Sequence, residues 1–355
     1  MKAEAMNRRG EAFALVWTTS LVIGLGACAS DDPSADKPRT RTERPAHDAG
    51  SKQAVEDEPI RGVTQASLAA IWGSGPDDVW AVGGDGVILR FDGTTLTRLE
   101  SGTTSRLQAV VGTDADDVWI AGDEGVTLHW NGEQLEKVFE SENEAVLGIW
   151  PNARDDVWFV GIVPAERAAL VRRWDGAGFH EQVIHGAASL WEAWASTPED
   201  LWLVGTSPNL QGIAFHGDGH DFAAIDYEGG PIRGVWGSGR EDVWLLPYES
   251  TPLQHWDGSA LSKSDEVPEV GMLGTWGSRP DDVWAVGLSG TILHYDGSHW
   301  ASVSSPTQEL LASVWGSAAD DVWIAGGSGT LLRWNGEAWR VFAAGGDTAA
   351  DADAI

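Results

Sequence analysis

One short motif, Asp-Val-Trp or a close variant, recurs seven times along the 355-residue chain and constrains its fold more than any other feature. Successive motifs lie 39 to 44 residues apart. The motif tryptophans are Trp80, Trp119, Trp158, Trp202, Trp244, Trp284 and Trp323. A second tryptophan stands eight residues before six of them, and Val111 takes its place in the second repeat. Self-similarity at a period of this length is typical of propellers and other repeat architectures.

Each repeat divides into four short runs that are rich in β-branched and aromatic residues. In the sixth repeat the runs are 272–276, 283–287, 291–295 and 299–303, bounded by Gly, Ser or Asp. Asp-Gly or Asn-Gly separates the last two runs of every repeat, which is a strong hairpin signal. The sequence therefore predicts an all-β fold, a seven-bladed β-propeller over residues 61–342 with four antiparallel strands per blade.

The repeat also resembles a known family. The sixth copy reads Asp-Asp-Val-Trp-Ala-Val-Gly and continues through Gly-Thr-Ile-Leu-His-Tyr-Asp-Gly to Trp300. This pattern resembles the propeller repeat of secreted bacterial proteins and lipoproteins, and it is similar to the repeat of two-component-regulator sensor propellers. The Gly-His of WD repeats, the Gly-Gly pair of kelch repeats and the glycine of sialidase-type Asp boxes are missing. The resemblance covers about 280 residues and implies a binding or scaffolding module.

Residues 1–27 have the profile of a lipoprotein signal peptide. A basic start is followed by the mostly apolar stretch 12–26, which is too short to span a bilayer. Leu25-Gly26-Ala27-Cys28 resembles the bacterial lipoprotein processing box, which implies cleavage before Cys28 and lipid attached to it. The alternatives are an ordinary signal peptide with a chance cysteine, or a buried apolar strand. We expect an extracytoplasmic protein anchored to the bacterial cell envelope, at the outer membrane.

Two further segments lie outside the repeats. Residues 28–60 contain no aromatic residue and have four prolines among mixed charges. Such a segment cannot bury enough apolar surface to order itself, so the sequence predicts a disordered tether. Residues 343–355 are predicted to form a flexible acidic tail.

The charge and the cysteine count exclude several classes of function. With 23 Lys and Arg against 54 Asp and Glu, the formal net charge is −31. A nucleic-acid partner is excluded because phosphate binding needs a basic face. Adsorption to anionic membranes is disfavoured, which leaves the lipid as the membrane contact. The single cysteine excludes internal disulfides and a Cys-rich zinc site. We expect no cofactor and no metal.

Polar residues that recur in every repeat are best explained by the blade itself. An acidic pair precedes each motif tryptophan, and a basic residue recurs two positions before each Asp-Gly or Asn-Gly. Seven acidic pairs would also suit calcium or paired-carboxylate catalysis. We favour a structural role, in which the basic residue pairs with an acidic residue of its own or the adjacent blade. The Ser, Thr or Asn before each pair is predicted to bond to backbone N–H groups of the turn.

Departures from the repeat identify the candidate surface. In a four-stranded blade, the loops between the second and third strands open on the same face as the blade-to-blade connections, here called the 2–3 face. These loops are lengthened in repeats three to five, and Glu192 stands where the other repeats have Ala, Gly or Ser. Such a charge needs a partner or water. Function on a rigid scaffold tends to lie on varied loops, although loops also lengthen without selection. The candidate binding residues are Glu166, Arg167, Trp191, Glu192, Asn209, Arg233, Tyr248 and Glu249.

Two functions remain open at this point. We expect a non-enzymatic binding or scaffold module for a protein or glycan partner of the cell envelope, without catalytic residues. The alternative is a polysaccharide lyase or glycosidase acting at the propeller axis. Propeller enzymes usually carry several ionisable inner residues, whereas here the inner positions are mostly apolar except Glu192 and Arg233.

The closure of the propeller ring is the last expectation. Each blade can be completed from its own repeat, and residues 60–63 are the spare apolar stretch that could add a strand. Blades one and seven are predicted to touch through four tryptophans, which are Trp72, Trp80, Trp315 and Trp323.

Overall fold

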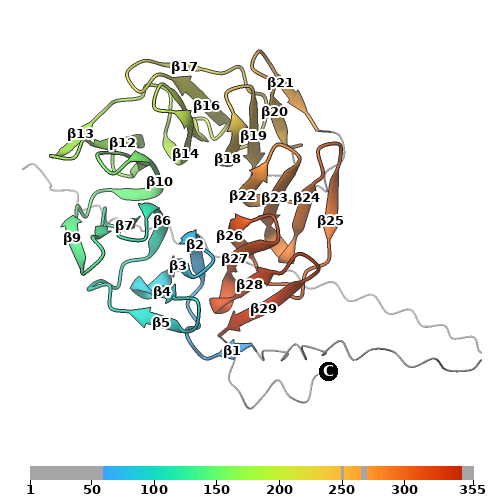
Figure 1. Cartoon of the computed structure of the whole chain (residues 1–355). Helices are drawn as coiled ribbons and strands as arrows, with labels where there is room; N and C mark the ends of the chain where they lie inside the picture. Colours follow the sequence, from blue (N-terminus) through green and yellow to red (C-terminus); the bar gives the residue numbers. More distant parts are fainter. Residues whose placement is uncertain (1–58, 249–251, 265–269, 346–355) are drawn as a thin grey trace, which may run out of the picture. The chain divides into compact units, whose positions relative to one another are not determined.

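The computed structural model describes residues 59–248, 252–264 and 270–345. Within these ranges the strands form seven sheets arranged in a ring, six with four strands and one with five (Figure 1). Each blade is built from strands that pair antiparallel with their neighbours in chain order. The predicted all-β, seven-bladed propeller with four antiparallel strands per blade is confirmed.

Within each blade the first strand lies innermost and the fourth lies on the outer side (Figure 1). The first four blades are β2 (Leu68–Gly75), β3 (Asp78–Gly83), β4 (Ile88–Phe91) and β5 (Leu96–Leu99); β6 (Leu107–Asp114), β7 (Asp117–Gly122), β8 (Thr127–Trp130) and β9 (Leu135–Phe139); β10 (Ala145–Ala153), β11 (Asp156–Val163), β12 (Ala168–Trp174) and β13 (Phe179–Glu181); and β14 (Ser189–Thr197), β15 (Asp200–Thr206), β16 (Gly212–Gly217) and β17 (Phe222–Ala224).

The last three blades complete the ring. They are β18 (Ile232–Gly239), β19 (Asp242–Pro247), β20 (Gln254–Trp256) and β21 (Leu261–Lys263); β22 (Met272–Arg279), β23 (Asp282–Gly287), β24 (Ile292–Tyr295) and β25 (Trp300–Val303); and β26 (Leu311–Ala318), β27 (Asp321–Gly326), β28 (Leu331–Trp334) and β29 (Trp339–Ala344). In blades one, six and seven, a three-residue 3₁₀ turn joins the second and third strands.

Neighbouring blades pack through the tryptophan that stands eight residues before the motif tryptophan. In five of the seven blade pairs its indole ring lies against a glycine in the inner strand of the next blade. A Cβ at that glycine would stand 2.5 to 2.6 Å from an indole carbon, so only glycine fits. These pairs are Trp72–Gly112, Trp194–Gly237, Trp236–Gly277, Trp276–Gly316 and Trp315–Gly73. The packing is therefore directional, since each of these five blades inserts its indole into the blade that follows.

Ring closure uses this contact and a fifth strand. The short strand β1 (Ile60–Arg61) pairs in parallel with β29 on the outer edge of blade seven. The ring thus spans residues 60–344, slightly more than the predicted 61–342. Trp315 and Trp323 pack into the core of blade one as predicted. Trp72 and Trp80 instead pack against blade two, because the contacts run in one direction around the ring.

Several predictions concern segments outside the described residues. The signal peptide 1–27, Cys28, the tether up to residue 58 and the tail from residue 346 all lie there, as does Glu249. No helix in the described ranges is long and apolar enough to cross a membrane.

The motif tryptophans form the core of each blade interface, and Trp284 is a representative case. It is 2 % exposed and packs with residues of blade seven, including Val314 and Leu332. Trp284→Ala is expected to lower the free energy of unfolding by ~3–5 kcal/mol, measured by urea denaturation, because it removes a buried aromatic side chain. Val183→Ala, at a position that is 75 % exposed, is the control. A loss below about 1 kcal/mol for Trp284→Ala would contradict this packing.

Candidate functional site

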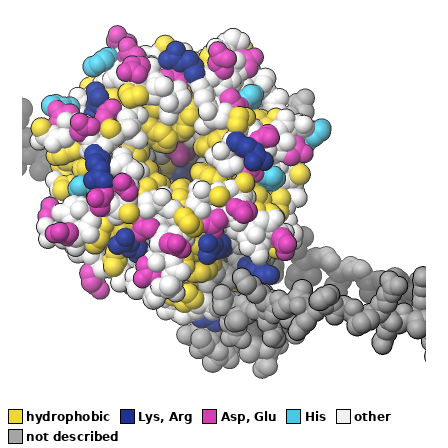
Figure 2. All heavy atoms as spheres, viewed as in Figure 1, with side chains coloured by type: hydrophobic (Ala, Val, Ile, Leu, Met, Phe, Trp, Pro, Cys, Tyr) yellow, Lys and Arg dark blue, Asp and Glu magenta, His cyan; other side chains and the backbone are white. Residues whose placement is uncertain are grey.

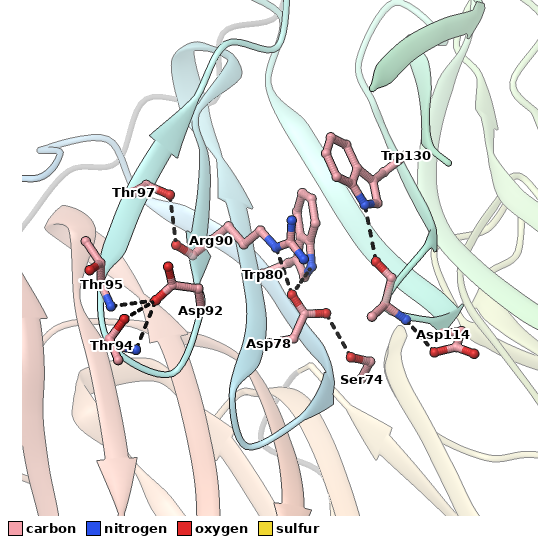
Figure 3. Close-up of polar contacts among 11 residues, drawn as sticks. Ser74, Asp78, Trp80, Arg90, Asp92, Thr94, Thr95, Thr97, Asp114 and Trp130 are labelled. Atoms are coloured by element: carbon pink, nitrogen blue, oxygen red, sulfur yellow. Dashed lines mark hydrogen bonds and ion pairs between the residues drawn. The ribbon is translucent and has the colours of Figure 1, made fainter. Parts of the chain in front are cut away.

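Each blade holds one aspartate, the second member of its acidic pair, between a polar side chain and a basic one. Figure 3 shows the arrangement in blade one. The Ser74 hydroxyl donates to Asp78 Oδ2 at 2.8 Å, and Arg90 Nε donates to Asp78 Oδ1 at 2.8 Å. The Arg90 guanidinium also lies 4.7 Å from the centre of the Trp80 indole ring. The carboxylate of Asp78 thus connects β2, β3 and β4.

The same arrangement occurs in all seven blades. The Ser, Thr or Asn four residues before each aspartate donates to its carboxylate. The basic partners are Arg90, His129, Arg173, His216, His255, His294 and Arg333, and each lies over the motif tryptophan of its own blade. The predicted pairing with an acidic residue of the same blade is confirmed. The predicted bond from the Ser, Thr or Asn to turn backbone is wrong, since these side chains bond to the aspartate.

These aspartates are structural anchors, and three of them have a lowered pKa. Burial of Asp200 opposes its charged form, but hydrogen bonds from Ser196 and His216 and the nearby positive charges outweigh burial. Its pKa therefore lies below the ordinary value, and Asp117 and Asp242 shift in the same direction for the same reasons. In the described part of the chain, no group of three or more His, Cys, Asp or Glu is placed to hold a metal ion.

The inner strand of every blade carries a β-bulge near the 2–3 face. The register with the second strand shifts there, so one extra residue stands at the inner edge of the blade. The seven extra residues, all partly accessible, are Ala69, Gln108, Leu147, Trp191, Arg233, Leu273 and Ala312. Bulges redirect side chains, so each blade presents one variable side chain near the axis. In Figure 2, hydrophobic side chains surround the hollow at the centre of the propeller ring.

Three of the predicted residues meet at this edge. The Arg233 guanidinium lies 3.4 Å from the centre of the Trp191 indole ring and 4.9 Å from that of the Tyr248 ring. Trp191 Nε1 donates to Thr206 Oγ1 at 3.3 Å, and Tyr248 N donates to Pro231 O at 2.8 Å, so both aromatic residues are fixed to neighbouring strand ends. We call Trp191, Arg233 and Tyr248 the arginine stack. It places a cation over two aromatic rings, one from blade four and one from blade five.

A second cation acts on the arginine stack. Burial lowers the pKa of Arg233 to about 10; Tyr248 opposes this shift, and the charge of Arg106 acts in the same direction as burial. Arg106 immediately precedes β6 in blade two and is exposed. Arg106 is not among the predicted binding residues, although the sequence marks it as a departure from the repeat. The other six repeats have the uncharged residues Ser67, Ala145, Ser189, Pro231, Gly271 and Leu310 at the same position.

Glu192 lies next to the arginine stack and is bonded to the following blade. Its Oε2 accepts a hydrogen bond from Val235 N–H at 3.0 Å, and a Cβ at Gly234 would lie 3.5 Å from the same oxygen. In blade seven, Ser313 Oγ accepts from Ile71 N–H of blade one in the same way. The predicted need for a partner is therefore met by backbone. Burial raises the pKa of Glu192 to about 8, so the carboxyl is mostly protonated at neutral pH.

The remaining predicted residues do not join this cluster. Glu166 and Arg167 are exposed in the turn 164–167 of blade three, and Asn209 is exposed in the loop 207–211 of blade four. Among the described residues no hydrogen bond or ion pair connects them to Arg233 or to one another. Elsewhere, an open groove lies between blades five and six, lined by Trp244, His255, Lys263, Tyr295, His299 and Trp300 among others. The His255 side chain is already bonded to Asp242.

Comparisons with known proteins identify the fold alone. No family model and no curated protein match the chain. The structure titled "YCF48 bound to D1 peptide" is similar over 78 % of this chain and 96 % of that one, with a TM-score of 0.63 and 16 % identity. The WD40 β-propeller domain of Doa1 is similar over 76 % and 92 %, with a TM-score of 0.64 and 12 % identity. A catalytically inactive virginiamycin B lyase from Staphylococcus aureus with quinupristin is similar over 76 % and 94 %, with a TM-score of 0.63 and 12 % identity.

The raised pKa of Glu192 predicts a distinct pH dependence of stability. Because the folded value of about 8 exceeds the ordinary 4.5, its stabilising contribution is fully present below about pH 4.5 and is lost as the pH rises to about 8. Glu192→Gln keeps an acceptor for Val235 and cannot ionise. Relative to this variant, the parent is expected to lose about 1.4 kcal/mol per pH unit between about pH 5 and pH 8.

Urea denaturation at pH 5, 6.5 and 8 measures this difference. Glu166→Gln, in an exposed loop, is the control and should follow the parent at every pH. A difference between Glu192→Gln and the parent that does not change with pH would show that Glu192 is ionised in the folded protein.

Proposed function

We propose that this protein is a lipid-anchored, extracytoplasmic propeller that binds a protein or glycan partner through the 2–3 face over blades three to five, without chemistry. The observation that carries the proposal is the arginine stack, in which an arginine lies over two aromatic side chains at the inner edge of the propeller ring. Aromatic residues and arginine contribute most of the binding energy at many interfaces. Residues already fixed in position also lose little conformational entropy on binding.

The chemistry of the inner edge favours binding over catalysis. Glu192 is the acidic residue there, and its pKa is set by burial and by the bond from Val235. No second carboxylate influences it within the described ranges, whereas glycoside hydrolysis uses two acting together. The seven aspartates that bond His or Arg serve to join strands. A polysaccharide lyase or glycosidase at the axis remains the second candidate, which the partly accessible, protonated Glu192 favours.

The structural neighbours are compatible with either role. One is described as bound to a peptide and another is a lyase, so a fold of this kind serves both. The repeat pattern supports a place among the propellers of secreted bacterial proteins and lipoproteins, and the processing box at Cys28 supports anchoring to the cell envelope at the outer membrane. We propose that the protein uses no cofactor and binds no nucleic acid.

Affinity capture from the native envelope tests the binding role. The full chain is compared with a variant in which blade-one sequence replaces the 2–3 loops of blades three to five and alanine replaces Trp191 and Tyr248. We expect a partner that the full chain retains and the variant loses. The control is His220→Ala in the exposed 3–4 turn of blade four, on the opposite face. Equal capture by all three folded proteins would exclude the 2–3 face as the binding surface.

Cys28→Ser tests the anchor. Thiol-linked lipid cannot form at serine, so the variant is expected to leave the membrane fraction or to remain unprocessed. Fractionation followed by mass measurement of the mature N-terminus distinguishes the two results from the parent. A variant that partitions with membranes like the parent would contradict lipid attachment at Cys28.

A further inference from the structure

Arg233 lacks the carboxylate that the other stacked arginines have. Arg90, Arg173 and Arg333 each lie over a tryptophan, and each donates from Nε to an aspartate at 2.6 to 2.8 Å. Arg233 lies over Trp191 in the same manner, but none of its N–H groups has an acceptor among the described residues. A guanidinium carries five donors in its plane, and stacking occupies only its faces. Its edge is therefore available to a ligand.

The charges around Arg233 favour an anion. The positive charge of Arg106 reaches Arg233, and Arg106 likewise has no ion pair in the described ranges. An anion bound at Arg233 is attracted by both positive charges. The arrangement is unusual for a chain of net charge −31, in which carboxylates are plentiful.

We propose, building on the function proposed above, that Arg233 binds the carboxylate of an acidic peptide segment of the partner at the axial opening of the 2–3 face. Arginine recognises carboxylates through two parallel hydrogen bonds, and these charge-assisted bonds are short and strong. Trp191 and Tyr248 hold the guanidinium in one orientation, so its donors are positioned before the ligand arrives.

The surroundings favour a peptide over an acidic glycan. One face of the Trp191 indole is covered by Arg233 at 3.4 Å, so that face cannot stack on a sugar ring. The bulge residues of the neighbouring blades, Leu147 in blade three and Leu273 in blade six, are apolar and partly accessible. They offer contacts to apolar side chains that flank an Asp or Glu in a peptide. An acidic polysaccharide has the carboxylates but lacks such side chains.

The net negative charge of the protein does not prevent this binding at physiological salt. At about 0.15 M salt the screening length is roughly 8 Å, so the distant carboxylates of the protein are largely screened. A carboxylate in direct contact with Arg233 is screened much less. Binding of an acidic peptide is therefore expected at this ionic strength.

Fluorescence anisotropy of the full chain with a labelled peptide of Glu, Leu and Ser tests the proposal, with the Gln-for-Glu peptide as the matched probe. We expect the Glu peptide to bind and the Gln peptide to bind at least about tenfold more weakly. Arg233→Met should weaken binding of the Glu peptide about tenfold or more, and Arg233→Lys should also weaken it because lysine lacks the planar fork. Arg106→Met should have a smaller effect. The control is Arg340→Met, at an exposed arginine of blade seven.

Thermal melts establish that each variant is folded. Equal binding of the two peptides, no binding of the Glu peptide, or an unchanged affinity of folded Arg233→Met would overturn the proposal. Polygalacturonate that binds through Arg233 while the peptide does not would assign the site to a glycan instead.

Failure of the acidic-peptide proposal can be distinguished from failure of the binding role. If envelope capture depends on the 2–3 face but survives Arg233→Met, the binding role stands and the acidic-peptide assignment falls.

Discussion

The contact between an indole ring and a glycine of the next blade is the constraint on which the rest of the structure depends. Because a Cβ at that glycine would stand about 2.6 Å from the indole, each such blade is held at one distance from its neighbour. The two remaining interfaces lack this indole–glycine contact. Between blades three and four, Trp150 packs against Ala195 instead of a glycine. Between blades two and three, Val111 replaces the tryptophan and Pro151 replaces the glycine. The closed ring then fixes where the inner strand of each blade lies.

Within that ring the repeated polar residues bond to one another inside their own blade. Each aspartate bonds a side chain of the first strand and a basic residue of the third, and the basic residue covers the motif tryptophan. The residues left for function are those that depart from the repeat. Arg233 illustrates the difference, since it stacks on an aromatic side chain like Arg90 but has no aspartate in the described part of the chain. The inner edge of blades four and five therefore carries an arginine without the carboxylate that Arg90, Arg173 and Arg333 have.

The fold was predictable because its determinants recur at a constant spacing, so seven weak signals reinforce one another. The arginine stack was predictable in part, since Trp191, Arg233 and Tyr248 each depart from their repeat position. Their proximity to one another depends on the β-bulge, which adds one residue to each inner strand and is not visible in the periodicity. The bond from Val235 to Glu192 and the effect of Arg106 on the pKa of Arg233 arise between blades, which a single repeat does not specify. Glu166, Arg167 and Asn209 lie on loops whose paths no repeat specifies.

The central claim is that the ring holds Arg233 ready for a carboxylate from outside the propeller. A crystal structure of the full chain with the bound Glu peptide tests it most directly. The claim predicts a peptide carboxylate within hydrogen-bond distance of the Arg233 guanidinium, with Trp191 and Tyr248 in the positions they occupy without ligand. A structure in which a carboxylate of the chain itself, such as that of Glu249, occupies the edge of Arg233 while the peptide lies elsewhere would contradict it.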